Sequence, residues 1–129
     1  MYKTVLVEEQ IQDGRKLLQQ LDAQTFRRRF PVPAALWYYW PESARWRLVI
    51  VSPIADRKGP NYGYSRIQEA LDRAKVTSLS LWDITLIGER DPELIELRSA
   101  VGTPLAGSLR GRGRGGGLSE DLYVYRWAI

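Results

Sequence analysis

Two apolar runs separated by a four-residue turn shape the expected fold of this chain more than any other segment. In residues 34–40 nearly every position is apolar, so we expect a strand with both faces covered at least in part. Residues 41–44 read Pro-Glu-Ser-Ala, which predicts a tight turn. Residues 45–52 predict the returning strand, with alternate apolar residues from Trp46 to Ile50 on one face. Together these segments predict an antiparallel hairpin.

A helix is expected over residues 4–24, because apolar side chains recur there at helical spacing. Gly14 in its middle costs about 1 kcal/mol relative to alanine, so it predicts a close crossing by another element. An alternative interpretation makes residues 2–7 a strand, since Val5 and Val7 alternate with polar neighbours. The apolar stripe of the helix comprises Val7, Ile11, Leu18 and Leu21.

Further signals predict the elements that follow the hairpin. Residues 52–61 contain two prolines and a glycine and are expected to form a loop. Residues 62–74 predict a helix, and residues 79–87 predict a third strand. Residues 91–102 begin with Asp-Pro-Glu and end with glycine, which predicts a helix between these signals, and residues 121–128 predict a closing strand. The expected core face of the last helix consists of Leu94, Leu97 and Val101.

The order of these elements is α-β-β-α-β-α-β, which predicts one α+β domain over residues 1–129. The hairpin implies an antiparallel-dominated sheet of about four strands, with about three helices packed mainly on one face. One domain also fits the length, because two halves would each be too small to bury a self-sufficient core. If residues 2–7 formed a strand, the chain up to residue 87 would instead read βαββαβ, a split βαβ core with a C-terminal extension.

Aromatic side chains concentrate in the predicted strands. In residues 121–128, strict alternation places Tyr123, Tyr125 and Trp127 on one side and the aliphatic residues on the other. Core packing is expected for most of these rings, but an exposed aromatic strip would suit a protein partner or a second copy of the chain. Aromatics displayed beside arginines could also stack on bases. The set comprises Trp37, Tyr38, Tyr39, Trp40, Trp46, Trp82, Tyr123, Tyr125 and Trp127.

The chain contains neither cysteine nor histidine. This excludes disulfides, thiolate nucleophiles, histidine metal sites and catalytic triads that depend on histidine. Metal-dependent nucleases use an acid-x-Lys triplet to hold magnesium and orient water, so Asp56-Arg57-Lys58 makes such an enzyme a third hypothesis. The triplet lies in a predicted Pro/Gly loop and not inside a strand, which weighs against the nuclease hypothesis. We therefore expect no catalytic residues, no metal site and no cofactor.

Basic residues outnumber acidic ones by 19 to 15, and 15 of the basic residues are arginine. The planar guanidinium suits phosphate and carboxylate partners, although a GC-rich genome produces the same bias. One cluster lies at residues 27–29. Another lies in an Arg/Gly-rich loop, residues 102–119, which holds seven of the eleven glycines and is either a phosphate-following segment or a mobile connection. The candidate nucleic-acid contacts are Arg110, Arg112, Arg114, Arg27, Arg28 and Arg29.

We therefore expect a non-enzymatic accessory or binding module. The leading hypothesis is that it binds single-stranded nucleic acid through the Arg/Gly-rich loop, helped by residues 27–29 if the two arginine clusters converge. The alternative is a protein partner or a homodimer that forms through the strand aromatics. Residues 1–10 lack the features of a secretory signal, and no apolar run approaches the ~18–20 residues of a membrane span, so we expect a cytoplasmic protein without membrane contact.

Overall fold

The computed structural model describes residues 6–40, 42–101 and 122–129, which form one α+β domain. The order of helices and strands is α-β-β-α-α-β-α-β, which confirms the predicted class and adds one short helix. Within these residues no helix is long and apolar enough to cross a membrane. The elements are α1 (Glu8–Asp22), η1 (Phe26–Arg28, a 3-10 helix), β1 (Ala34–Trp40), β2 (Arg45–Val51), α2 (Pro53–Lys58), α3 (Pro60–Ala74), η2 (Leu81–Asp83, a 3-10 helix), β3 (Ile84–Ile87), α4 (Glu93–Val101) and β4 (Leu122–Trp127).

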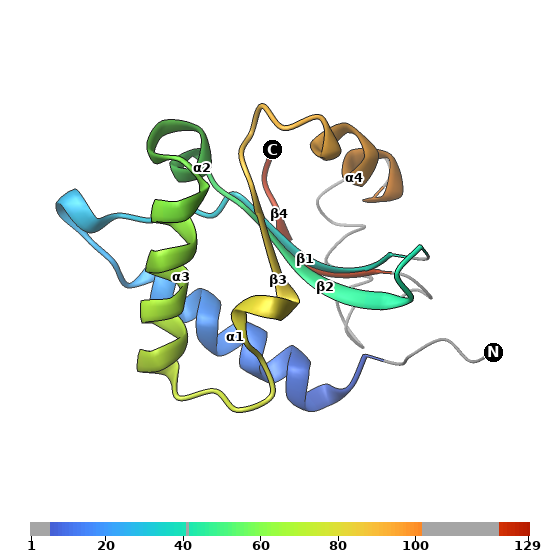
Figure 1. Ribbon diagram of the computed structural model, residues 1–129, viewed down its shortest axis with the longest axis horizontal. Helices are drawn as coiled ribbons and strands as arrows, with labels where there is room; N and C mark the ends of the chain where they lie inside the picture. The colour runs from blue at the N-terminus through green and yellow to red at the C-terminus, as the bar shows by residue number, and fades with distance from the viewer. Residues whose placement is uncertain (1–5, 41, 102–121) are drawn as a thin grey trace.

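The four strands form one sheet in the order β3-β2-β1-β4 (Figure 1). β1 and β2 pair antiparallel from Ala34 opposite Val51 to Trp40 opposite Arg45, which confirms the predicted hairpin. β4 pairs antiparallel with β1, whereas β3 runs parallel to β2. Parallel strands need a long crossover connection, and α2 and α3 provide it. The sheet is therefore mixed and mostly antiparallel.

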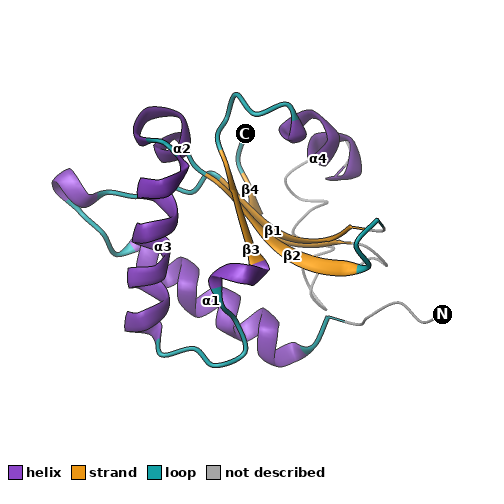
Figure 2. Cartoon of the chain, viewed as in Figure 1, coloured by secondary structure: helices purple, strands orange, loops and turns teal. Residues whose placement is uncertain are grey.

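Different helices cover the two faces of the sheet (Figure 2). α1 and α3 pack against the face that presents Trp37, Leu48 and Ile50. α4 packs against the opposite face, and its buried residues are those expected from the sequence: Leu94, Leu97 and Val101. Because both faces of β1 are covered, its apolar residues on both sides contribute to the core, as its sequence predicted.

Residues 52–61, which were predicted to form a loop, contain the helix α2. The Ser52 hydroxyl caps this helix by accepting a hydrogen bond of 3.2 Å from the backbone N–H two residues further on, and Pro53 occupies the first helical position. Gly59, with a φ of 88°, ends α2, and Pro60 begins α3. The loop prediction was wrong because both prolines stand where a helix needs no N–H donor, so they mark helix starts.

The third strand begins at Ile84 and is shorter than the predicted span of residues 79–87. The preceding turn η2 is stabilised locally by Ser80. Its hydroxyl accepts a hydrogen bond of 3.3 Å from the N–H of Trp82, and its own N–H donates to the Asp83 carboxylate at 3.0 Å. Such side-chain bonds offer the backbone an alternative to strand pairing. Trp82 therefore lies outside the sheet, contrary to the prediction.

A β-bulge changes the orientation of side chains along β4. The pairing with β1 shifts by one residue, which leaves Tyr125 as the extra residue of the bulge. Trp127 consequently packs on the same face as Leu122 and Val124, whereas Tyr123 packs on the other face. The prediction for Trp127 was wrong because strict alternation does not continue past an inserted residue.

The predicted first helix is confirmed over Glu8–Asp22, and Gly14 marks a close crossing as expected. A Cβ at Gly14 would overlap the Tyr125 hydroxyl, which donates a hydrogen bond of 2.6 Å to the carbonyl of Ile11. The same hydroxyl accepts a hydrogen bond of 2.9 Å from Nε1 of Trp37. Residues 2–5 of the strand alternative lie outside the described residues, and the split βαβ alternative that depends on them is untested.

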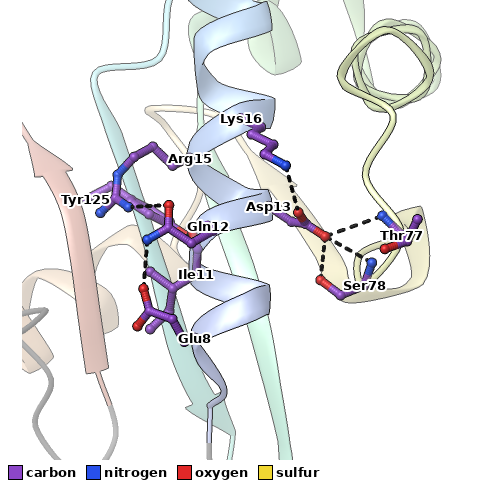
Figure 3. A network of polar contacts seen from close by, with 9 residues as sticks. All are labelled: Glu8, Ile11, Gln12, Asp13, Arg15, Lys16, Thr77, Ser78 and Tyr125. Atoms are coloured by element: carbon purple, nitrogen blue, oxygen red, sulfur yellow. Dashed lines mark hydrogen bonds and ion pairs between the residues drawn. The ribbon is translucent and has the colours of Figure 1, made fainter.

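Asp13 ties α1 to the segment that follows α3 (Figure 3). Its Oδ2 accepts hydrogen bonds from the Ser78 hydroxyl at 2.6 Å, the Ser78 N–H at 3.0 Å and the Thr77 N–H at 3.3 Å. Burial favours the neutral carboxyl, but these hydrogen bonds and the charge of Lys16 outweigh it and lower the pKa of Asp13 below its ordinary value. Asp13 is therefore a charged anchor inside the fold.

Candidate functional site

A cleft of about 350 Å³ opens between the turn that contains η1 and the end of α2. Figure 1 shows the segment between α1 and β1 looping outward, on the same side of the molecule as α2 and α3. Among the described residues that line it, four are basic, three are apolar and none is acidic. We call this group the basic cleft, and it consists of Phe26, Arg27, Arg29, Pro31, Ile54, Arg57 and Lys58.

A buried arginine of α3 holds the η1 side of the basic cleft in place. Arg66 has a side chain only 5% exposed, and its Nη2 donates a hydrogen bond to the backbone carbonyl of Arg28. Its Nη1 donates to the hydroxyl of Tyr62 at 2.9 Å, and its guanidinium lies 5.7 Å from the ring centroid of Phe30. These partners satisfy the buried cation and attach the middle of the arginine cluster to α3.

The three predicted arginines of this cluster do not share one role. The guanidinium of Arg28 binds the carboxylate of Glu69 on α3 at 2.6 Å, and the same carboxylate lies 3.8 Å from Nε of Arg66, so Arg28 already has an anionic partner. Arg27 and Arg29 line the basic cleft. Across the described ranges, neither of these two forms an ion pair with an acidic residue. Arg27 and Arg29 are therefore the members of the cluster that remain available to an anion.

The α2 side of the basic cleft is formed by Arg57 and Lys58 in the last helical turn. Cations at this position also interact favourably with the carbonyl end of a helix. Asp56, although adjacent in sequence, is occupied elsewhere: its carboxylate accepts a hydrogen bond of 2.8 Å from the N–H of Glu89 and lies against Gly88. Arg57 and Lys58 of this triplet therefore line the cleft, whereas Asp56 does not.

The charge distribution of the basic cleft favours an anionic ligand. In the part of the chain that the structure describes, no acidic side chain pairs with Arg57 or Lys58, as none does with Arg27 or Arg29. Four cations around one cleft raise the local positive electrostatic potential, which attracts an anion. A bound anion also reduces the repulsion between the four cations. The apolar residues beside them add a surface for a flat or apolar group.

Sequence reasoning identified only part of this site. Arg57 and Lys58 were considered only for a nuclease, and Phe26 was not considered at all. The signals of a capped helix, Ser-Pro at its start and Arg-Lys-Gly at its end, could have placed these two cations in a last helical turn. No sequence signal places them beside Arg27 and Arg29. The remaining predicted contacts, Arg110, Arg112 and Arg114, lie outside the described residues, so their convergence with this cluster stays a prediction.

The carboxylate of the acid-x-Lys triplet has a structural partner, and so do the carboxylates of Asp83 and Asp91. Asp56 binds the backbone after β3, Asp83 forms an ion pair with Arg45 at 3.6 Å, and Asp91 accepts a hydrogen bond of 2.9 Å from the N–H of Glu93. In the ranges with described coordinates, no three acidic side chains gather as ligands for a metal ion. The nuclease hypothesis gains no support from these residues.

Most aromatics of the sheet pack into the core. Four of them are buried, namely Trp37, Tyr39, Trp46 and Tyr123, and four are half-buried, namely Tyr38, Trp40, Tyr125 and Trp127. Trp82, by contrast, is 80% exposed. A protein partner or homodimer on the strand aromatics stays a prediction, whereas the core packing of most of these rings is as the sequence predicted.

Comparisons with protein-family models, with curated protein sequences and with solved structures found no match. A fold alone does not define a function, so the chemistry of the basic cleft has to carry the functional assignment.

Proposed function

We propose that this chain is a non-enzymatic module that binds nucleic acid through the basic cleft. The supporting observation is that Arg27 and Arg29 from one segment lie with Arg57 and Lys58 from another around a single cleft. A phosphate backbone is a row of anions, and each phosphate that a Lys or Arg neutralises releases condensed counterions. Guanidinium groups also bind phosphate oxygens through two parallel N–H donors.

The Arg/Gly-rich loop, residues 102–119, is a second and separable part of this proposal. Its alternating arginines Arg110, Arg112 and Arg114 would contact further phosphates of the same strand. Because glycine leaves the backbone free to follow a strand, this contribution needs no preformed shape. The cleft and the loop can therefore be tested independently.

The cleft is tested by binding a labelled single-stranded oligonucleotide at increasing salt, measured by fluorescence anisotropy. The four cations of the cleft contribute about −2.8 to the slope of log affinity against log salt, because each phosphate contact contributes about −0.7 on a single strand. This contribution alone makes a roughly fourfold rise in salt weaken binding about fiftyfold. The double variant Arg27→Ala/Arg29→Ala removes two of the four cleft contacts, so the slope should become less steep by about 1.4.

The matched control is Arg73→Ala/Arg98→Ala, which removes the same charge from exposed positions on α3 and α4 outside the cleft. This control should keep the slope near that of the wild type. If both double variants gave the wild-type slope, the basic cleft would not be the binding site. A third variant with Arg110, Arg112 and Arg114 replaced by alanine measures the loop: a flatter slope supports its role, and an unchanged slope removes the loop from the proposal.

A further inference from the structure

Phe26 combines two unfavourable properties at the edge of the basic cleft. Its side chain is 89% exposed, and its φ of 54° places a bulky residue in the left-handed region. The two other described non-glycine residues with positive φ have ordinary reasons: Ala44 lies in the hairpin turn, and Lys75 ends α3. Phe26 lies neither in a hairpin nor at the end of an α-helix but opens the η1 turn. Strained backbones that persist often serve a binding site.

The surrounding structure holds Phe26 in this conformation. The N–H of Arg29 donates a hydrogen bond of 3.1 Å to the Phe26 carbonyl, which closes the η1 turn. Arg66 binds the carbonyl of Arg28, and Glu69 binds the guanidinium of Arg28, so the turn is attached to α3 at two points. Because the backbone of this turn is anchored, binding a ligand at the Phe26 ring orders little additional backbone. Phe26 therefore presents its exposed ring from a fixed place on the surface.

The neighbours of Phe26 indicate the chemistry of that contact. Arg27 and Arg29 supply cations for phosphate, while the Phe26 ring supplies a face on which a flat heterocycle can stack. The cleft volume of about 350 Å³ lies at the lower end of the range for small-molecule sites, which is enough for one base. In a duplex the bases stack on one another inside the helix, so a protruding ring cannot reach their faces.

We infer that Phe26 is a stacking platform for an unpaired base, so that the basic cleft selects single-stranded over double-stranded nucleic acid. This inference rests on the proposed function and adds the residue that would recognise an unpaired base. DNA and RNA strands both offer a phosphate next to an unpaired base, and both are ligands of this kind.

Three labelled probes of equal length, about 12 nucleotides, separate stacking from charge. They are an oligothymidylate, a strand made of abasic nucleotides, and a duplex. Phe26→Ala should weaken oligothymidylate binding about tenfold and change abasic-strand binding by less than about twofold. Phe26→Trp keeps an aromatic face and should retain the wild-type affinity for oligothymidylate. Because the Phe26 ring is exposed, neither variant removes core packing.

Trp82→Ala is the matched control, since it removes another exposed aromatic ring that does not line the basic cleft. It should leave the affinity for every probe unchanged. The inference is overturned if Phe26→Ala weakens the oligothymidylate and the abasic strand equally, if it weakens neither, or if the wild type binds the duplex as tightly as the single strand. Absence of salt-dependent binding to the abasic strand by the wild type would instead reject the proposed function itself.

Discussion

Gly14→Ala in helix α1 should destabilise the protein, although alanine is the better helix former. A Cβ at this position would overlap the hydroxyl oxygen of Tyr125 and lie 3.0 Å from its Cζ. The Tyr125 ring cannot move away without loss, because its hydroxyl donates to the Ile11 carbonyl at 2.6 Å and accepts from Trp37 Nε1 at 2.9 Å. The added methyl group must therefore displace a hydroxyl that has two hydrogen-bond partners.

Three contributions set the expected change in the free energy of unfolding. Helix propensity favours alanine by about 1 kcal/mol. Overpacking opposes it by about 1–3 kcal/mol. A displaced Tyr125 hydroxyl also leaves the fully buried Trp37 N–H without its acceptor, which costs about 1–3 kcal/mol more. Taking the middle of each range, we expect Gly14→Ala to lower the free energy of unfolding by about 3 kcal/mol.

A double-mutant cycle with Gly14→Ala and Tyr125→Phe measures this effect. Urea unfolding is recorded for the wild type, each single variant and the double variant. Tyr125→Phe removes the oxygen that the new methyl group would overlap, so only the 3.0 Å approach to Cζ offsets the helix propensity of alanine, and Gly14→Ala should be nearly neutral in that background. The free energies of the two single substitutions should therefore not add. A Gly14→Ala variant more stable than the wild type, or the same cost in both backgrounds, would refute the steric reasoning.

Two further substitutions test the polar anchors of the fold. Asp13→Asn should lower the free energy of unfolding by about 1–3 kcal/mol near neutral pH, because it weakens the hydrogen bonds from Thr77 and Ser78. Since folding lowers the pKa of Asp13, its contribution is present above the ordinary value of 3.8 and is lost as the pH falls through the lower folded value. Urea unfolding of both proteins across the acid range should show the difference shrinking, and a pH-independent difference would contradict this. Ser52→Ala removes the cap of α2 and should lower stability by about 1 kcal/mol in the same assay, whereas Ser43→Ala in the exposed turn should be nearly neutral. Equal effects of the two serine substitutions would argue against the cap.

Local patterns were sufficient for elements whose deciding interactions lie between near neighbours in sequence. The hairpin of β1 and β2 follows from two apolar runs and a turn, and the core face of α4 follows from its spacing and its Asp-Pro-Glu start. Helix α2 was missed although its signals are local, because Pro53 and Pro60 were interpreted as breakers rather than as first helical residues. The orientation of Trp127 could not be predicted from neighbouring residues, since it depends on a bulge in the pairing of β4 with β1.

The sequence by itself determined which charges and rings the candidate site could use. It supplied an arginine cluster at residues 27–29, an Arg-Lys pair at the end of a capped helix, and no cysteine or histidine for other chemistry. Only the tertiary structure decided how these groups are distributed. It compensates Arg28 with Glu69 and leaves Arg27 and Arg29 facing the cations of α2. The physical reason is that contacts between distant segments arise from the packing of whole helices on a sheet, which spacing along the chain does not encode.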